Sequence, residues 1–409
     1  MGRFVVVVLD SFGIGAMADV EAVRPQDIGA NTCKHIIKAV PDLHLPNLAQ
    51  LGLMNALGEE VGAMGYSADA VFGTADLMHM GADSFYGHQE LMGTRPQQPL
   101  LQPFAEVIER VYAALSKAGY AVRYAGDKAR ILIVNDSVAV GDNLETDPGQ
   151  VYNVSGCLDV VPFEDVVAIG QVVRSVVQVA RVIALGGEAV SFEQLMEAHV
   201  AKLDGVHAGI DTPKSGLYAR GYRVIHLGYG VDASVQIPNI LGREGIEVSL
   251  IGKVGDIVDN RYGSIFPGVE TAYLFIRLLD EVERIQHGFI CLNIQETDLA
   301  GHAQHTQGYA DCLRVCDAYI GELMERMKDD DILIVTADHG NDPTIGHSQH
   351  TREQVPVLAY RQGVRGIKLG HMPTLSDIGA TVADYFSAEP PENGQSFLSK
   401  LKKLKSVSS

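Results

Sequence analysis

The chain alternates between short, almost wholly apolar runs and longer segments that are apolar on one side. Val5–Leu9, Phe289–Ile294 and Ile332–Val335 are runs of the first kind. Strands that are buried on both faces have this pattern, and parallel sheets consist of such strands. Segments with the apolar spacing of a helix, such as Tyr309–Lys328, separate the runs. The alternation predicts an α/β fold with a mainly parallel sheet that helices cover on both faces.

The same periodicity predicts the other elements of this sheet domain. A further strand is expected at Ile246–Ile251. Helices are expected at Leu45–Gly52, Ile237–Arg243, Glu270–Ile285, Tyr309–Lys328 and Leu375–Phe386. Residues 100–227 read as a separate, smaller α/β block. We therefore predict a core formed by residues 1–99 and 228–409, with a cap domain inserted at 100–227, because 409 residues exceed a single compact core.

Two other segments have a distinctive composition. Val166–Leu185 is the most apolar long stretch, but polar residues recur in it at spacings of three and four. They are Gln171, Arg174, Gln178 and Arg181. Such a stripe predicts an amphipathic helix rather than a membrane span. Met80–Pro99 is rich in glycine, proline and glutamine, which predicts a loop-rich crossing.

The net charge of the chain bears on which partners it can bind. The formal net charge is −19. Sequence-independent binding to nucleic acid needs a basic face, so we expect no nucleic-acid partner. Anionic substrates stay open, because bound divalent cations can invert the local field.

The cysteines bear on the compartment. There are five, an odd number, and none are spaced as Cys-x-x-Cys. Such a set is neither a disulfide framework nor a zinc knuckle. The apolar run at Phe4–Leu9 is too short for a signal peptide. These features predict a protein of the reducing cytoplasm.

Carboxylates and histidines follow three of the predicted strands. Asp10 follows the first strand, Asp338 and His339 follow Ile332–Val335, and Asp298 and His302 follow Phe289–Ile294. The carboxyl ends of parallel strands lie along one edge of a sheet, so these side chains can converge although they are far apart in the sequence. Mixed carboxylate and imidazole ligands suit Mn²⁺, Zn²⁺ or Fe²⁺ better than Ca²⁺. The pattern predicts a metal site at this edge.

A two-metal site that transfers a phosphoryl group needs a nucleophile. Ser84, on a glycine-bracketed loop, is the candidate, and an ordinary turn serine is the alternative. Lys253 ends a core strand at the same edge and could contact a substrate phosphate or be a surface lysine. Arg352 could likewise bind substrate phosphate or pair with an acid of the sheet domain, and the structural role is favoured.

The residues around these positions resemble the phosphopentomutase family of the alkaline phosphatase superfamily. The shared segments are Leu9–Gly15, Leu45–Leu53, Gly81–Gly93, Gly252–Asp256, Thr336–Pro343, His350–Glu353, Val355–Tyr360 and Asp377–Val382. The resemblance covers most of the sheet domain and is weak through residues 100–227. It implies an alkaline-phosphatase-like core.

Matching motif positions carry the family's metal ligands onto this chain. The resemblance implies one metal held by Asp10, Ser84, Asp338 and His339. It implies a second metal held by Asp298, His302 and His350. Mn²⁺ is the expected ion, with Zn²⁺ and Mg²⁺ as alternatives. The family's nucleophile is a threonine, and Ser84 keeps its hydroxyl.

Several positions depart from the family pattern. Ala82 stands where family members have a lysine, and Gln89 where they have a tryptophan. The family's Ser-Ala-Asp-Ser segment corresponds to Val154–Cys157, which lacks the acidic residue. The arginine-rich sugar-phosphate segment has no clear counterpart around residues 220–232. These departures concern recognition of the substrate rather than the metals.

The leading prediction is a metal-dependent phosphomutase that moves a phosphoryl group within a sugar phosphate through phosphorylated Ser84. A two-metal phosphohydrolase is the first alternative, in which water resolves the phosphoenzyme. A non-catalytic binding protein that keeps the fold is the second. The expected partner is a small phosphorylated substrate, and no membrane is expected.

Overall fold

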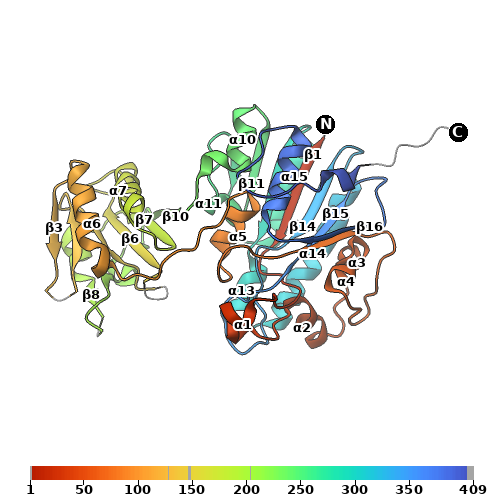
Figure 1. The fold of residues 1–409 in the computed structure, drawn as a ribbon, viewed down its shortest axis with the longest axis horizontal. Coiled ribbons are helices and arrows are strands. Elements are labelled where there is room, and N and C mark those ends of the chain that lie inside the picture. The colour runs from red at the N-terminus through yellow and green to blue at the C-terminus, as the bar shows by residue number, and fades with distance from the viewer. Residues whose placement is uncertain (1, 128, 146–148, 203, 403–409) are drawn as a thin grey trace. The chain divides into compact units, whose positions relative to one another are not determined.

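The chain folds into two compact units (Figure 1). One unit comprises the residues up to 96 together with those from 232 onward, and the other comprises residues 97–231. The sequence-based boundaries, 99/100 and 227/228, lie close to these. The computed structural model describes residues 2–127, 129–145, 149–202 and 204–402.

An eight-stranded sheet forms the centre of the first unit. Its order is β12 (Ser264–Phe266), β11 (Glu247–Ile251), β13 (Gly288–Ile294), β1 (Arg3–Leu9), β14 (Ile332–Thr336), β15 (Val355–Tyr360), β2 (Val71–Ala75) and β16 (Ile367–Met372). Within the described chain, β15 alone runs against its neighbours, and the other pairings are parallel. The prediction of a mainly parallel α/β sheet is confirmed.

The helices of this unit form two packed groups. The first contains α2 (Thr32–Ala39), α3 (Pro46–Leu51), α4 (Leu53–Leu57), α12 (Thr271–Arg284), α13 (Glu296–His302) and α14 (Thr306–Arg326). The second contains α5 (Ser84–Leu91), α10 (Ile237–Arg243), α11 (Lys253–Ile257) and α15 (Ser376–Phe386). A short helix, α1 (Val20–Val23), lies in the long connection that follows β1.

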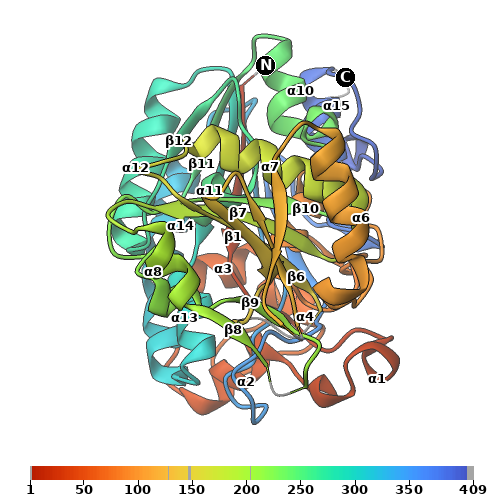
Figure 2. The same cartoon turned by 90° about the vertical axis from the view of Figure 1, so that its left-hand side faces the viewer.

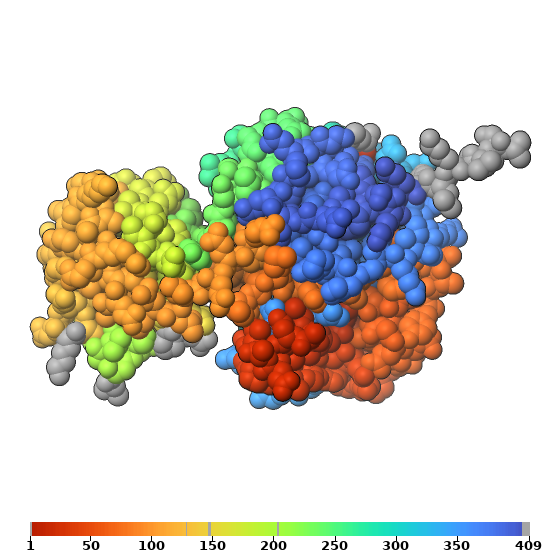
Figure 3. Space-filling view, in the orientation of Figure 1, coloured from red at the N-terminus to blue at the C-terminus, as the bar shows by residue number. Residues whose placement is uncertain are grey.

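Two consecutive residues of β1 show that the groups cover opposite faces of the sheet. The side chain of Arg3 reaches the carbonyls of Val282 and Arg326, at the ends of α12 and α14. The ring of Phe4 packs on Tyr385 of α15, with ring centroids 5.6 Å apart. Successive residues of a strand point to opposite faces. In Figure 3, the amino-terminal and carboxyl-terminal segments of this unit lie side by side on its surface.

The second unit is built on a six-stranded sheet, of which β6, β7 and β10 are labelled in Figure 2. Its order is β10 (Arg223–Gly228), β7 (Arg181–Gly187), β6 (Val151–Cys157), β5 (Val138–Asp142), β4 (Ile131–Val134) and β3 (Val122–Ala125). Only β6 and β7 pair in parallel among these described strands.

Each face of this second sheet has its own apolar core. One core includes residues of α6 (Phe104–Lys117) and α7 (Phe163–Val176). The other includes residues of α8 (Phe192–Glu197) and of the hairpin β8–β9 (His199–Ala201 and Ala208–Ile210), and α9 (Thr212–Ser215) contacts α8. The unit therefore has the cores of an independent domain.

Two predicted segments differ from the structure. The helix predicted at Val166–Leu185 is wrong in its second half, because α7 ends at Val176 and β7 begins at Arg181. The guanidinium of Arg174 binds the carbonyls of Val177 and Val179, at 2.5 and 2.8 Å, where the helix has ended. The polar stripe therefore combined residues of a helix, a connection and a strand.

The loop-rich crossing predicted at Met80–Pro99 contains a helix, α5 (Ser84–Leu91). The carboxylate of Asp83 caps this helix by accepting a hydrogen bond from the backbone N–H of Tyr86 at 3.1 Å. The glycines of the segment predicted a loop, but the segment contains this helix, and all residues of the helix are buried. Tertiary contacts, rather than helix propensity, stabilise it.

A buried ion pair fixes the start of the central strand. Arg3 is 2% exposed, and its Nε donates to Asp331 Oδ2 at 3.0 Å. Its backbone N–H donates to Oδ1 of the same carboxylate at 2.7 Å. Asp331 thus holds β1 beside β14, and its removal would leave a buried cation without a counterion.

We predict that Asp331→Ala lowers the free energy of unfolding by about 3–5 kcal/mol. Urea unfolding followed by circular dichroism measures this. Asp330→Ala is the matched control, because the neighbouring side chain is exposed and its expected effect is below about 0.5 kcal/mol. Equal effects of the two substitutions would contradict the structural role of Asp331.

Candidate metal centre

The candidate site lies at the carboxyl ends of three adjacent strands of the first unit. β1 pairs in parallel with β13 and with β14, so the ends of all three strands meet at one edge. Asp10 follows β1, Asp338 and His339 follow β14, and Asp298 lies on α13 just after β13. The topology thus brings together residues that are hundreds of positions apart.

The first cluster contains Asp10, Asp338, His339 and Ser84. Nε2 of His339 lies 3.5 Å from Asp10 Oδ1 and 3.2 Å from Asp338 Oδ2. The Ser84 hydroxyl donates to Asp338 Oδ2 at 2.7 Å. All four residues are buried, with Ser84 at 6% exposure. Ser84 is the first residue of α5, so the capped start of that helix aims its hydroxyl at the cluster.

The second cluster contains Asp298, His302 and His350. Nε2 of His302 lies 3.3 Å from Asp298 Oδ2, and Nε2 of His350 lies 3.3 Å from Oδ1. The two Nε2 atoms are 3.0 Å apart. His339 joins the clusters, because its ring stacks on that of His350 with centroids 3.9 Å apart. The resemblance assigned His339 to one metal, whereas in the structure this histidine is close to both groups.

The tautomers of the three histidines favour metal binding. In each, Nδ1 contacts a backbone carbonyl, which can only accept a hydrogen bond. Nδ1 therefore carries a proton, and each ring in its neutral form presents the Nε2 lone pair to the cluster. Histidine ligands of metals have this arrangement. The carbonyls are those of Gly340 for His339 (2.9 Å), Ser348 for His302 (2.7 Å) and Ala82 for His350 (2.8 Å).

Two buried atoms of the site lack the partner that a protein interior normally supplies. Asp10 Oδ1 and His339 Nε2 have no hydrogen-bond partner within the described part of the chain. Buried polar atoms rarely stay unpaired. A divalent cation would satisfy both atoms, so the residues present fit a metal ion.

Burial and mutual repulsion shape the charges of the site. Burial, and then the Asp338 carboxylate, raise the pKa of Asp10 to about 6. Burial alone would also raise the pKa of Asp338, but His339 and His88 hold it well below its usual value. Although burial opposes it, Asp338 raises the pKa of His339 to about 9. The site thus concentrates negative charge and attracts cations.

The sequence matches the metalloenzyme superfamily model over residues 2–390. It is also 30% identical over 430 aligned positions to a protein of Kosmotoga olearia named phosphopentomutase. That alignment covers 97% of this chain and 98% of the relative.

The chain belongs to the phosphopentomutase family of metalloenzymes.

Solved structures of similar fold are more distant. A phosphoglycerate mutase of Leishmania mexicana is 13% identical, with a TM-score of 0.48 and 97% of each chain covered. The PH0037 protein of Pyrococcus horikoshii is 15% identical, with a TM-score of 0.43, and the match covers 94% of this chain and 97% of that one. These scores are low, so neither similarity enters the argument. Among the described helices of this metalloenzyme, none is long and apolar enough to span a membrane.

Lys253 places an ammonium group inside the metalloenzyme site. Its Nζ lies 2.8 Å from Asp10 Oδ2 and 3.5 Å from Asp298 Oδ2. Lys253 begins α11 directly after Gly252, whose φ of 76° favours glycine. A Cβ at Gly252 would also lie 2.5 Å from the carbonyl oxygen of Asn293. This glycine lets the lysine enter the site beside the end of β13.

Arg352 has a structural environment. It is 3% exposed, and Asp19 accepts hydrogen bonds from its Nε and Nη2 at 2.8 Å each. Its remaining three N–H groups donate to the carbonyls of Leu77, His79 and Gly81. All five donors are used, which favours the structural alternative over a contact with substrate phosphate. Arg352 holds the segment that leads into Ser84.

Two residues considered from the sequence lie behind the site. His347 lies 3.1 Å from Asp27 Oδ1 and does not join the clusters. Asp342 accepts from the backbone N–H of Asn31 at 3.0 Å and contacts His35. Asp342 thus links the loop that carries His350 to the segment that contains Asn31 and His35.

Sequence reasoning missed two residues that hold the metal-site carboxylates. Nδ2 of Asn293 donates to Asp10 Oδ2 at 3.1 Å. Nδ2 of Asn341 donates to Asp298 Oδ1 at 3.0 Å. Asn293 could have been identified from the sequence, because it is a polar residue within an apolar strand. In the structure it is fully buried.

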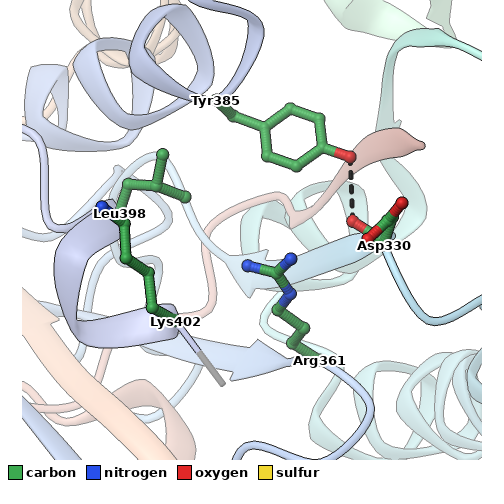
Figure 4. A pocket seen from close by; sticks show the side chains of 5 residues that line it. All are labelled: Asp330, Arg361, Tyr385, Leu398 and Lys402. Atoms are coloured by element: carbon green, nitrogen blue, oxygen red, sulfur yellow. Dashed lines mark hydrogen bonds between the residues drawn. The ribbon is translucent and has the colours of Figure 1, made fainter. Parts of the chain in front are cut away.

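A separate cavity of about 270 Å³ lies elsewhere in the first unit (Figure 4). Asp330, Arg361, Tyr385, Leu398 and Lys402 line it. Tyr385 accepts from the N–H of Gly2, so the cavity lies at the amino ends of the strands. It is therefore at the sheet edge opposite the metal centre.

Glu90 anchors the helix that carries Ser84. Its buried carboxylate contacts Nδ1 of His79 at 2.8 Å and accepts from the Thr374 hydroxyl at 2.7 Å. It also accepts from the backbone N–H groups of Met78 and Leu375. Burial would raise the pKa of Glu90, but these hydrogen bonds, with that from His79 foremost, lower it below the ordinary 4.5.

A carboxylate with a lowered pKa stabilises the fold above its unfolded-state pKa, and the stabilisation is lost as the pH falls through the lowered value. We predict that Glu90→Gln lowers the free energy of unfolding by about 1–3 kcal/mol at neutral pH. The difference from the unsubstituted protein should shrink as the pH falls below 4.5. Urea unfolding at a series of pH values measures this.

Glu325→Gln is the control, because Glu325 is exposed on α14. Its unfolding free energy should follow that of the unsubstituted protein at every pH. A cost of Glu90→Gln that does not vary with pH would contradict the role given to the ionised carboxylate.

Proposed function

We propose that this metalloenzyme is a metal-dependent phosphomutase, an isomerase that moves a phosphoryl group within a sugar phosphate. The observation that carries the proposal is a hydroxyl at the centre of a metal-type cluster. Ser84 Oγ lies 2.7 Å from Asp338 Oδ2, and the unpaired Nε2 of His339 lies 3.2 Å from the same oxygen. The family relationship to a phosphopentomutase supports an isomerase.

Two divalent ions would occupy the site. Asp10, Ser84, Asp338 and His339 would hold one ion. Asp298, His302 and His350 would hold the other. Mn²⁺ is the proposed ion, with Zn²⁺ and Mg²⁺ as alternatives. When bound, such ions neutralise the charge of a transferring phosphoryl group and favour the deprotonated form of a coordinated hydroxyl.

Side chains of the protein would carry out the attack on phosphorus and orient the reacting groups. Ser84 Oγ would attack the phosphorus of a bound sugar bisphosphate and release the sugar monophosphate. Asp338, which accepts the hydrogen bond of the Ser84 hydroxyl, would orient that oxygen. Lys253, whose ammonium lies within the cluster, would offer its charge to the phosphoryl oxygens. The phosphorylated Ser84 would then pass its group to the free hydroxyl of a bound sugar monophosphate. It would recover a phosphoryl group from the other position of the resulting bisphosphate, which releases the positional isomer and restores the phosphorylated Ser84.

The proposed role of residues 97–231 is that of a cap that excludes water and selects the sugar. Exclusion of water separates a mutase from a hydrolase with the same metals. In a phosphohydrolase, water would resolve the same phosphoserine and release inorganic phosphate. The product distribution therefore decides between the two activities.

We predict that the protein becomes phosphorylated on Ser84 when it is incubated with Mn²⁺ and a sugar bisphosphate. Intact-mass and peptide analysis should locate one phosphoryl group there. Ser84→Ala should lose the modification and lower kcat/KM by roughly 10⁴–10⁶-fold. Ser84→Thr keeps the hydroxyl, so it should still be phosphorylated.

A panel of sugar monophosphates, each with a catalytic amount of its bisphosphate, tests the reaction class. A mutase converts the substrate into its positional isomer without releasing phosphate. Phosphate release without isomerisation would identify the hydrolase. Unchanged turnover in Ser84→Ala would overturn both mechanisms.

We predict that the protein retains two Mn²⁺ ions per chain after dialysis, measured by elemental mass spectrometry. His350→Asn should reduce this number, because it removes a ligand of the second ion. His347→Asn is the matched control from the same loop and should retain both ions, since His347 contacts Asp27 instead. Equal metal loss in both variants would contradict the ligand assignment.

Chelation of the metal should also lower the thermal unfolding temperature. When the free ion concentration is 100 times the Kd, binding stabilises the folded state by about 2.7 kcal/mol. The shift should be smaller in His350→Asn than in His347→Asn.

A further inference from the structure

His88 connects the nucleophile helix to the metal-site carboxylates. It lies one helical turn after Ser84 on α5 and is fully buried. Its Nδ1 lies 2.9 Å from the backbone carbonyl oxygen of Ser84 and 3.2 Å from Asp338 Oδ2. Its Nε2 lies 2.9 Å from Nδ2 of Asn293. Both ring nitrogens therefore face residues that adjoin the metal centre.

The hydrogen bonds of Asn293 determine which ring nitrogen of His88 carries the proton. Nδ2 of Asn293 lies 3.1 Å from Asp10 Oδ2, and a carboxylate only accepts, so the amide nitrogen faces Asp10. The same Nδ2 donates its other hydrogen to Nε2 of His88. Nε2 must then be the acceptor, which leaves the proton on Nδ1. The assignment follows from the hydrogen-bond network.

The Nδ1–H group is thereby directed at two acceptors. One is the backbone carbonyl of Ser84, which lies at the amino end of the helix. The other is Asp338 Oδ2, the same oxygen that accepts the Ser84 hydroxyl. A carboxylate that accepts bonds from both groups has little freedom to rotate. His88 thus couples the orientation of Asp338 to the position of the nucleophile.

We infer that His88, as the Nδ1–H tautomer, and Asn293 form a positioning pair that holds Asp338 and Asp10 in place for metal binding beside Ser84. The pair binds neither metal nor substrate. It acts on the first metal cluster from both sides, through Asp338 at one end and Asp10 at the other. The inference rests on the proposed function in that it assumes a metal at this cluster.

A purely structural role would have different consequences. A histidine that only packs α5 against the sheet would affect folding stability and leave metal affinity unchanged. A positioning residue affects metal affinity as well, because misplaced carboxylates bind a cation less well. Loss of such a residue typically weakens metal binding by about 10–100-fold.

The test compares substitutions of the positioning pair with a substitution that affects only stability. His88→Ala should weaken Mn²⁺ binding at the first cluster by about 10–100-fold in calorimetric titrations. His88→Asn can place an amide N–H where Nδ1–H lies, so it should recover part of the loss. Asn293→Leu should weaken binding in the same range. Asp331→Ala is the control: Asp331 pairs with Arg3 at the amino end of β1, away from the metal centre, so stability should fall while affinity stays within about twofold.

Nitrogen-15 NMR of histidine-labelled protein reads the tautomer directly, with diamagnetic Zn²⁺ or Mg²⁺ in place of Mn²⁺. His88 should show a protonated Nδ1 and a bare Nε2. Asn293→Leu should remove the donor to Nε2 and perturb this pattern. A protonated Nε2 in the unsubstituted protein would overturn the inference. So would unchanged metal affinity in a folded His88→Ala.

The outcomes separate this inference from the proposed function. If the protein binds metal and His88→Ala weakens that binding, but no phosphoryl transfer occurs, the proposed function fails and the positioning pair stands. If transfer occurs and His88→Ala binds metal normally, the positioning pair fails alone. If no metal binds at all, both fail.

Discussion

The fold must hold three carboxylates close together in an interior that excludes water. Asp10, Asp298 and Asp338 meet at the end of the central strands, and all are at most 3% exposed. Two like charges about 4 Å apart repel by about 4 kcal/mol at an effective dielectric constant of 20. The protein lowers this cost with the Lys253 ammonium, the amides of Asn293 and Asn341, and the backbone N–H of Ser11. Even so, Asp10 keeps a raised pKa, so the site still favours a cation.

The same constraint explains why the surrounding loops are so heavily hydrogen-bonded. A ligand set is useful only if its members stay in place, and loops do not provide this by themselves. Arg352 uses every donor of its guanidinium on the segment before Ser84. Glu90 anchors the helix that follows, and Glu353 binds both Thr32 and Thr351 behind the His350 loop. Buried polar groups around the site thus hold the ligand-bearing segments rigid.

Much of this arrangement was predictable because it follows from strand topology. Apolar runs that end in Asp10 and in Asp338 mark parallel strands with acids at one edge, and periodicity alone reveals them. Ser84 and His350 were beyond periodicity, because neither lies at a strand end. Ser84 was a candidate from its glycine-bracketed loop, with an ordinary turn serine as the alternative, and the family resemblance then selected both residues.

Other features could not be read from the sequence, because tertiary contacts decide them. The glycine-rich segment around Ser84 has weak helix propensity, yet α5 forms there because it is buried on all sides. The polar spacing through Val166–Leu185 fits one helix, yet Arg174 binds carbonyls beyond the helix end and β7 follows. The partners of Asn293 and Arg352 lie far away along the chain, so no local pattern indicates them.

Ala82 and Gln89, two positions at which the sequence departs from the family pattern, contribute no side-chain contact to the metal-type clusters. Ala82 replaces a lysine, but its contact with the site is the backbone carbonyl that accepts from His350 at 2.8 Å, which any residue can supply. Gln89 stands where the family pattern has a tryptophan, and its amide accepts from Gln236 and donates to the carbonyl of Ile257. Charge compensation in a dry site fixes the ligands and their hydrogen-bond partners, because a single change leaves a buried charge unpaired.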